Sequence, residues 1–140
     1  MKKISDIDKN VLARIRKGCV IPAQPLALDE NRKFMPQNQR ALCRYYIDAG
    51  AGGIAVGVHS TQFEIRKPEI GLYEPVLRET SRFIDEWCQR RNTRILKVAG
   101  VCGRIEQAEY EADFASSSST ICPRGWQGHR RNLEPSRPGR

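Results

Sequence analysis

The sequence predicts an α/β fold built on a parallel sheet. Three short apolar runs, at residues 19–23, 53–58 and 95–99, alternate with longer segments in which apolar residues recur at helical spacing. The run 53–58 is apolar throughout, as expected of a strand that is covered on both faces, and it lacks the alternation of a half-solvated strand. Strands that alternate with helices through short links are typical of a parallel α/β protein.

Two helices are expected in the first half of the chain. Residues 4–17 place isoleucine, valine and leucine on one stripe, and Gly18 follows as a stop. Residues 36–49 begin with Pro36, which suits a first helical turn, and are followed by Gly50.

Two further helices are expected at residues 75–91 and 104–115. The first has a regular apolar face that includes Phe83 and Trp87, which we expect in the core. A long polar loop, residues 59–72, precedes it, and a short glycine-containing loop precedes the second.

The pattern changes at residue 116. Four serines are followed by a segment rich in arginine, proline and glycine, without helical or strand periodicity. The expected organisation is therefore one domain over residues 1–115 and a low-complexity tail over residues 116–140. Either the tail is disordered, or a frameshift has replaced the evolved continuation of the domain.

The net charge of +8 does not indicate a nucleic-acid-binding face. Residues 116–140 hold five arginines and one glutamate, so half of the excess charge lies in the tail, whereas charges of both signs are mixed over the body. No nucleic-acid partner is expected. The alternative is that the tail is a flexible phosphate-binding arm that uses Arg124, Arg130, Arg131 and Arg137.

The remaining composition favours a cytoplasmic protein without a metal or a cofactor. No apolar stretch approaches the roughly 20 residues of a membrane span, and no apolar segment follows Lys2 and Lys3 to make a secretory signal. The five cysteines are scattered and form no C-x-x-C pair, and the two histidines are far apart in sequence. Reduced thiols and no zinc site are the simplest interpretation.

Three stretches carry a family resemblance that extends over residues 18–115. VIPAQPLALDENRK (residues 20–33), YYIDAGAGGIAVGV (45–58) and RILKVAGVCGRIEQA (94–108) resemble, in order and spacing, the first strands and loops of the dihydrodipicolinate synthase and N-acetylneuraminate lyase family of pyruvate-dependent aldolases. Gln24 stands where the family usually has threonine. The resemblance implies the N-terminal portion, about three β/α units, of a TIM (β/α)8 barrel.

The resemblance also implies a binding site for a pyruvate-like keto acid. GVHSTQFE, residues 57–64, resembles the family's G-T-T-G-E loop, although two residues replace one glycine. On this basis Ser60, Thr61 and Gly57 would bind the substrate carboxylate, since a carboxylate only accepts hydrogen bonds. His59 and Glu64 are secondary candidates, and His59 would be either a general base or a solvated side chain.

The family's catalytic residues are not expected in this chain. The family reaction needs a lysine at the end of the sixth strand, which forms a Schiff base with the keto group, and a tyrosine from the fifth strand. Lys97 is the last lysine and lies in the third expected strand, and Tyr110 does not match the family's tyrosine. A complete barrel needs roughly 250 residues, so the sequence predicts a barrel that is truncated before its Schiff-base lysine.

Two functions follow as expectations. The first is Schiff-base lyase or aldolase chemistry, which holds for the family. The second is a fragment with no activity of its own, which associates with itself as a homo-oligomer to cover an open sheet edge.

Overall fold

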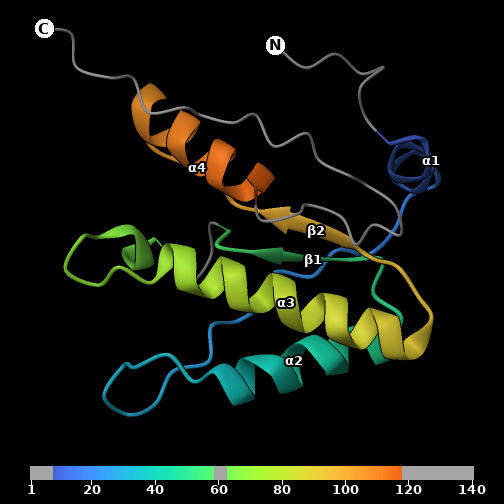
Figure 1. The fold of residues 1–140 in the computed structure, drawn as a ribbon, viewed down its shortest axis with the longest axis horizontal. Helices are drawn as coiled ribbons and strands as arrows, with labels where there is room; N and C mark the ends of the chain where they lie inside the picture. The colour runs from blue at the N-terminus through green and yellow to red at the C-terminus, as the bar shows by residue number, and fades with distance from the viewer. Residues whose placement is uncertain (1–7, 59–62, 118–140) are drawn as a thin grey trace, which may run out of the picture.

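The computed structural model describes residues 8–58 and 63–117 (Figure 1). This part of the chain has a mixed α/β fold with four α-helices, a two-stranded parallel sheet and a short 3-10 helix, η2. The elements in chain order are α1 (Lys9–Lys17), α2 (Pro36–Asp48), β1 (Gly53–Val56), η2 (Glu64–Arg66), α3 (Tyr73–Arg91), β2 (Leu96–Ala99) and α4 (Ile105–Ser117).

Three of the four helices lie close to their predicted bounds, whereas α1 begins at Lys9, with Asp8 as its N-cap, and not at residue 4 as predicted. α2 begins at Pro36 as expected, and α3 begins two residues before the predicted position because Tyr73 and Glu74 extend its first turn. α3 ends at Arg91 as predicted, and its C-cap Asn92 adopts the left-handed conformation (φ 49°) that commonly terminates a helix. α4 continues to Ser117. Most of the predicted tail, residues 118–140, lies outside the described residues.

β1 and β2 pair in parallel, with Gly53 opposite Leu96 and Val56 opposite Ala99. Both agree with predicted strands. The described part of the sheet is open and not closed into a barrel.

The first predicted strand, residues 19–23, forms only a single parallel bridge, between Ala23 and Ala55 on the free side of β1. The Ala55 amide donates to the Pro22 carbonyl at 2.9 Å, and the Gln24 amide donates to the Ala55 carbonyl at 2.8 Å. Pro22 faces β1 and has no N–H to donate, so one hydrogen bond of a regular parallel ladder cannot form here. In space, β1 lies between this segment and β2.

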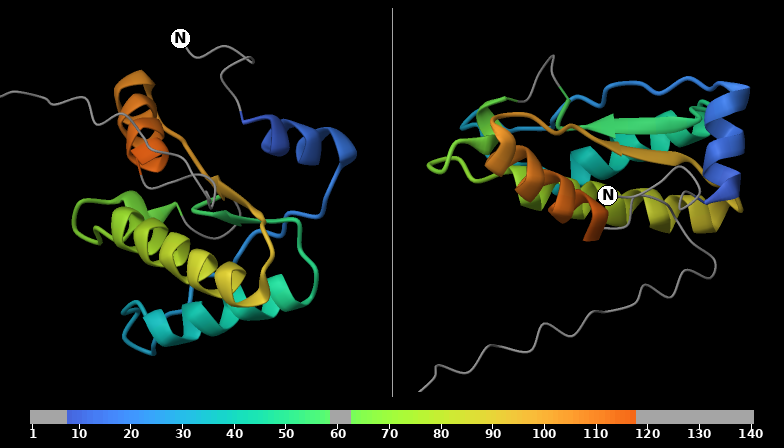
Figure 2. Two further views of the ribbon diagram at one scale, coloured as in Figure 1. Left: turned by 45° about the vertical axis from the view of Figure 1, so that its right-hand side comes forward. Right: turned by 90° about the horizontal axis from the view of Figure 1, so that it is seen from above.

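α2 and α3 pack side by side and cover one face of the sheet (Figures 1 and 2). α4 lies against the first turns of α3, where the rings of Phe114 and Tyr73 have centroids 6.3 Å apart. α1 stands apart from these helices, at the amino ends of the strands, and contributes no buried residue (Figures 1 and 2).

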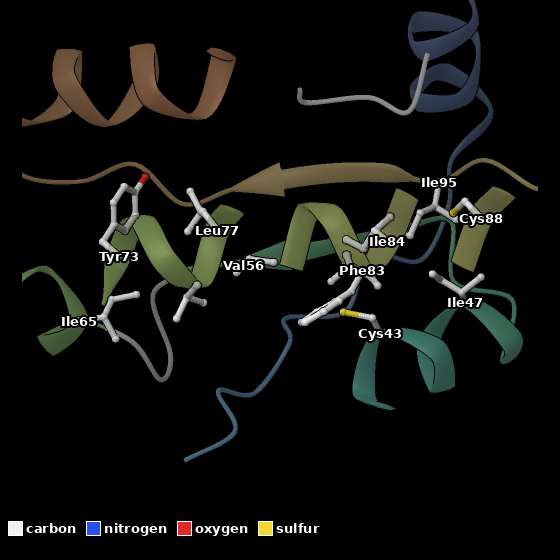
Figure 3. Packing of buried hydrophobic residues seen from close by; sticks show 12 residues of the cluster. Cys43, Ile47, Val56, Ile65, Tyr73, Leu77, Phe83, Ile84, Cys88 and Ile95 are labelled. Atoms are coloured by element: carbon white, nitrogen blue, oxygen red, sulfur yellow. The ribbon is translucent and has the colours of Figure 1, made fainter. Parts of the chain in front are cut away.

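The core lies between the sheet and the α2–α3 pair (Figure 3). Ile54 and Val56 of β1 point into it, whereas the alternate positions on β1 are the small residues Gly53 and Ala55. Phe83 is buried as expected, but Trp87 lies at the margin of the core, where its indole N–H donates to Asp48 at 2.9 Å. The buried cluster contains Cys43, Ile47, Ile54, Val56, Ile65, Tyr73, Val76, Leu77, Phe83, Ile84, Cys88 and Ile95.

Among the described residues, no helix combines the length and the apolar character that crossing a membrane requires.

Candidate functional site

The carboxyl ends of β1 and β2 meet at one edge of the sheet, and a glycine follows each strand. Gly57 has φ +68°, a conformation that favours glycine. Gly100 lies so close to it that a Cβ on Gly100 would be 2.2 Å from the Gly57 carbonyl oxygen. Only a residue without a side chain fits at Gly100, so the two loops leave the sheet with their backbones in contact.

Arg66, the last residue of η2, joins these two strand ends. Its Nη2 donates to the carbonyl oxygens of Gly57 and Gly100, both at 2.9 Å. Its Nε donates to Glu111 of α4 at 2.9 Å. The side chains of Arg66 and Glu111 are only 8% and 3% exposed, so this ion pair is buried.

Glu111 accepts hydrogen bonds on both carboxylate oxygens. Oε1 accepts from Arg66 and from the Gln107 amide group at 2.8 Å, and Oε2 accepts from the Cys102 backbone N–H at 3.1 Å. Burial alone would raise the pKa of Glu111, but the hydrogen bonds from Gln107, Arg66 and Cys102 outweigh it and hold this pKa below its usual range. Glu111 is therefore a carboxylate at neutral pH.

Tyr73, the first residue of α3, completes the arrangement. Its hydroxyl donates to the Gly100 carbonyl at 2.9 Å, and the Arg66 guanidinium lies over its ring at 4.5 Å from the centroid. Burial, together with the charge of Glu111, raises the pKa of Tyr73 to about 12, so its hydroxyl remains a neutral donor.

We call Arg66, Tyr73 and Glu111, with the glycines at 57 and 100, the strand-end clasp. Arg66 and Glu111 carry opposite charges, and they hydrogen-bond to one another, to backbone groups and to the Gln107 side chain. The clasp therefore fixes the backbone where a parallel α/β protein binds its ligand, and supplies no nucleophile.

The clasp includes Gly57 from the predicted carboxylate-binding set. His59, Ser60 and Thr61 lie outside the described residues. Glu64, the first residue of η2, is exposed and pairs with Lys67 at 2.7 Å. The hydrogen bond from Lys67 lowers the pKa of Glu64. In the structure, Gly57 therefore accepts a hydrogen bond from Arg66, whereas Glu64 pairs with Lys67.

Lys97 lies on the face of β2 that is covered by α3. Its Nζ forms an ion pair with Asp85 at 2.6 Å and contacts the Ser81 hydroxyl at 2.9 Å, and its side chain is 7% exposed. Tyr110 of α4 is exposed and hydrogen-bonds to Glu74.

Gln24 also faces the helices. It is fully buried, and its side-chain amide contacts the Cys43 sulfur at 3.2 Å. Burial raises the pKa of Cys43 to about 11, so this thiol is neutral and belongs to the core. Nearby, buried Gln39 accepts from the Ala27 amide at 2.9 Å and thereby anchors the loop that follows the first apolar segment to α2.

Sequence reasoning missed Arg66, Tyr73 and Glu111. The glycines after two adjacent strands are a signal in the sequence for close backbone approach. No comparable signal distinguishes Glu111 from Glu106, Glu109 and Asp113 on the same helix.

Comparison of the chain with family models, with curated proteins and with solved structures finds no match in any of the three.

Proposed function

We propose that this chain carries the keto-acid carboxylate-binding part of a Schiff-base aldolase or lyase of the dihydrodipicolinate synthase and N-acetylneuraminate lyase type. The observation that carries the proposal is the order of the sheet: the first apolar segment, β1 and β2 lie side by side in chain order and in parallel. α2 and α3 cover one face of this arrangement. Consecutive β/α units of a TIM barrel follow one another in this order with their helices outside the strands, so the order of the sheet supports the proposal.

The position of Gly57 supports the proposed site. It follows β1 directly, at the carboxyl edge where barrel enzymes bind their substrates. In the proposal, the hydroxyls of Ser60 and Thr61 and the amide of Gly57 donate to the carboxylate of a pyruvate-like acid, with His59 and Glu64 at its border. Neutral donors suit this ligand because they satisfy its oxygens without a compensating charge.

Lys97 is not the Schiff-base nucleophile in this proposal. A Schiff base forms on an amine that a keto group can reach, whereas Lys97 Nζ is paired with Asp85 and its side chain is only 7% exposed. Lys97 also faces α3, away from the side of the sheet that would line a barrel. In the proposal, the chain therefore binds the keto acid, and Lys97 does not carry out the covalent step.

Pyruvate binding, measured by ligand-observed NMR, tests the proposal. We expect the 140-residue chain to bind pyruvate, and the double substitution Ser60→Ala/Thr61→Ala to weaken binding at least about tenfold, because each lost hydrogen bond to a charged group costs about 1.5–3 kcal/mol. Ser116→Ala, which removes an exposed hydroxyl from α4, is the matched control and should bind as the unmodified chain does. Equal binding by all three proteins, or none by the unmodified chain, would refute the proposed site.

The outer edge of β2 favours a second candidate, self-association without catalysis. Among the described residues, β2 pairs with β1 alone, and an unpaired strand edge is a template for another strand. Val98 on β2 and Val101 just after it are 37% and 44% exposed, so apolar side chains accompany this edge. A second copy of the chain would cover both.

A further inference from the structure

We infer that Arg66 is a positioning residue for the carboxyl edge of the sheet: it holds Gly57 in the conformation that the proposed carboxylate site requires. This inference rests on the proposed function, and it adds a residue that neither the sequence nor the family resemblance assigns to the site.

Arg66 closes the segment to which it belongs. Gly57 precedes it by nine residues, and the side chain returns to the Gly57 carbonyl at 2.9 Å. Because C=O and N–H point in opposite directions across a trans peptide, fixing this carbonyl also fixes the direction of the Val58 N–H, the first amide after Gly57. The guanidinium thereby determines how the chain leaves β1.

The same nitrogen joins this segment to the next β/α unit. Nη2 has two hydrogens, and it donates one to Gly57 and the other to Gly100, which follows β2. The two loops are therefore held at one separation by a single planar group.

Glu111 extends the connection to a third backbone group. One of its oxygens accepts from Arg66 Nε, and the other accepts from the Cys102 amide in the loop after β2. One buried ion pair thus fixes the carbonyls of Gly57 and Gly100 and the amide of Cys102. Such a pair is a weak source of net stability, because desolvation offsets most of the attraction, but it specifies geometry.

Lysine cannot replace arginine in this role. The fork of the guanidinium reaches two carbonyls and a carboxylate in one plane, which lies over the Tyr73 ring. A lysine ammonium is a point charge on a flexible stem, so Arg66→Lys keeps the charge opposite Glu111 but loses the bridge between the glycines.

The test compares Arg66→Lys with Arg82→Lys, an exposed arginine that pairs with Glu79 on the surface of α3. Amide hydrogen exchange is followed at Gly100, whose N–H donates to Val56, and at Cys102, whose N–H donates to Glu111. We expect Arg66→Lys to accelerate exchange at both amides at least about tenfold, while exchange at core amides of α3 changes little. We also expect this substitution to weaken pyruvate binding at least about tenfold. Arg82→Lys should change neither.

Unchanged exchange at Gly100 and Cys102 in Arg66→Lys, or equal acceleration at every amide, would overturn the inference, since the second result is that of a general loss of stability. If Arg66→Lys does not fold, Glu111→Gln serves instead, because it keeps the shape and an acceptor for Cys102 but removes the ion pair. Faster exchange with unchanged pyruvate affinity would also overturn the positioning role. Absence of pyruvate binding by the unmodified chain would refute the proposed function, while the exchange rates would still decide whether the clasp holds the two strand ends.

Discussion

Three charged side chains that this fold buries, those of Arg66, Lys97 and Glu111, each lie beside an opposite charge. A buried charge without a partner would cost several kcal/mol or lose its ionisation. The partners come from different elements: Arg66 of η2 meets α4, and Lys97 of β2 meets α3. Each ion pair therefore also connects two elements that pack against each other.

We predict that pyruvate and borohydride leave Lys97 unmodified. Its amine lies under α3, where it pairs with Asp85 and contacts the Ser81 hydroxyl, so a keto group cannot reach the nitrogen. Mass spectrometry of proteolytic peptides measures the reduced adduct at each lysine. Exposed Lys67 is the internal control for non-specific reaction, and an adduct that forms on Lys97 in preference to Lys67 would contradict the assignment.

Glu111 should make the free energy of unfolding depend on pH. Its pKa in the fold is below the usual value of 4.5, so the folded protein favours the carboxylate. This contribution is present above pH 4.5 and is lost as the pH falls through the lower folded pKa. We expect Glu111→Gln to cost about 2–4 kcal/mol at neutral pH, with a difference from the unmodified protein that shrinks in acid.

Urea unfolding at a series of pH values measures this difference. Glu106→Gln, at an exposed position in the first turn of the same helix, is the control and should remain close to the unmodified protein throughout. A cost for Glu111→Gln that is independent of pH below 4.5 would show that the carboxylate charge is not what stabilises the clasp.

At the scale of the elements, the sequence patterns identified the helices and two of the strands. Continuous apolar runs and helical spacing are local properties, and both are visible in one sequence. The first apolar run resembles the other two in composition but forms one bridge. Pro22 was the signal, since a residue without an N–H removes a hydrogen bond from a ladder.

The strand-end clasp could not be predicted from the sequence, because its contacts join residues that are far apart along the chain. Arg66 lies 34 residues from Gly100 and 45 residues from Glu111. α4 has four acidic side chains, and the packing of its helix against α3 decides which one turns inward. Of the predicted site, the structure places Gly57 at the carboxyl edge of the sheet. Whether Ser60 and Thr61 bind a ligand there stays a prediction.

The contact between α3 and the sheet should dominate the stability of the fold. Ile84 is 1% exposed in the centre of the core cluster (Figure 3). We expect Ile84→Ala to lower the free energy of unfolding by about 2–5 kcal/mol, because truncation loses apolar burial and leaves a cavity. Denaturant unfolding measures the loss. Ile105→Ala, at a 76% exposed position, is the control, and equal effects of the two substitutions would contradict the described packing.

At the scale of the whole molecule, the described part has a helix layer on one face of an open sheet. The two proposed functions, keto-acid binding and self-association, would use different parts of this sheet: the carboxyl edge and the outer edge of β2. Ligand binding uses the ends of the strands, whereas self-association uses their side.

If the chain self-associates through β2, its mass in solution should depend on protein concentration. Val98→Lys should shift this mass toward that of the monomer, because a lysine at a strand edge opposes further strand pairing. Light scattering coupled to size-exclusion chromatography measures this mass. Tyr45→Lys changes a 67% exposed residue on α2 and is the matched control. A concentration-dependent mass that responds equally to both substitutions would place the contact elsewhere, and a monomer at all concentrations would exclude this candidate.

The most direct test of a keto-acid site at the carboxyl edge is a pyruvate titration followed by backbone amide NMR shifts. The account predicts saturable shifts centred on Gly57 and Val58, with smaller ones at Gly100 and Cys102, which the clasp connects to Gly57. Amides of α1, at the opposite end of the strands, should not move. Shifts confined to other surfaces, or none at pyruvate concentrations that saturate ordinary carboxylate sites, would contradict the account.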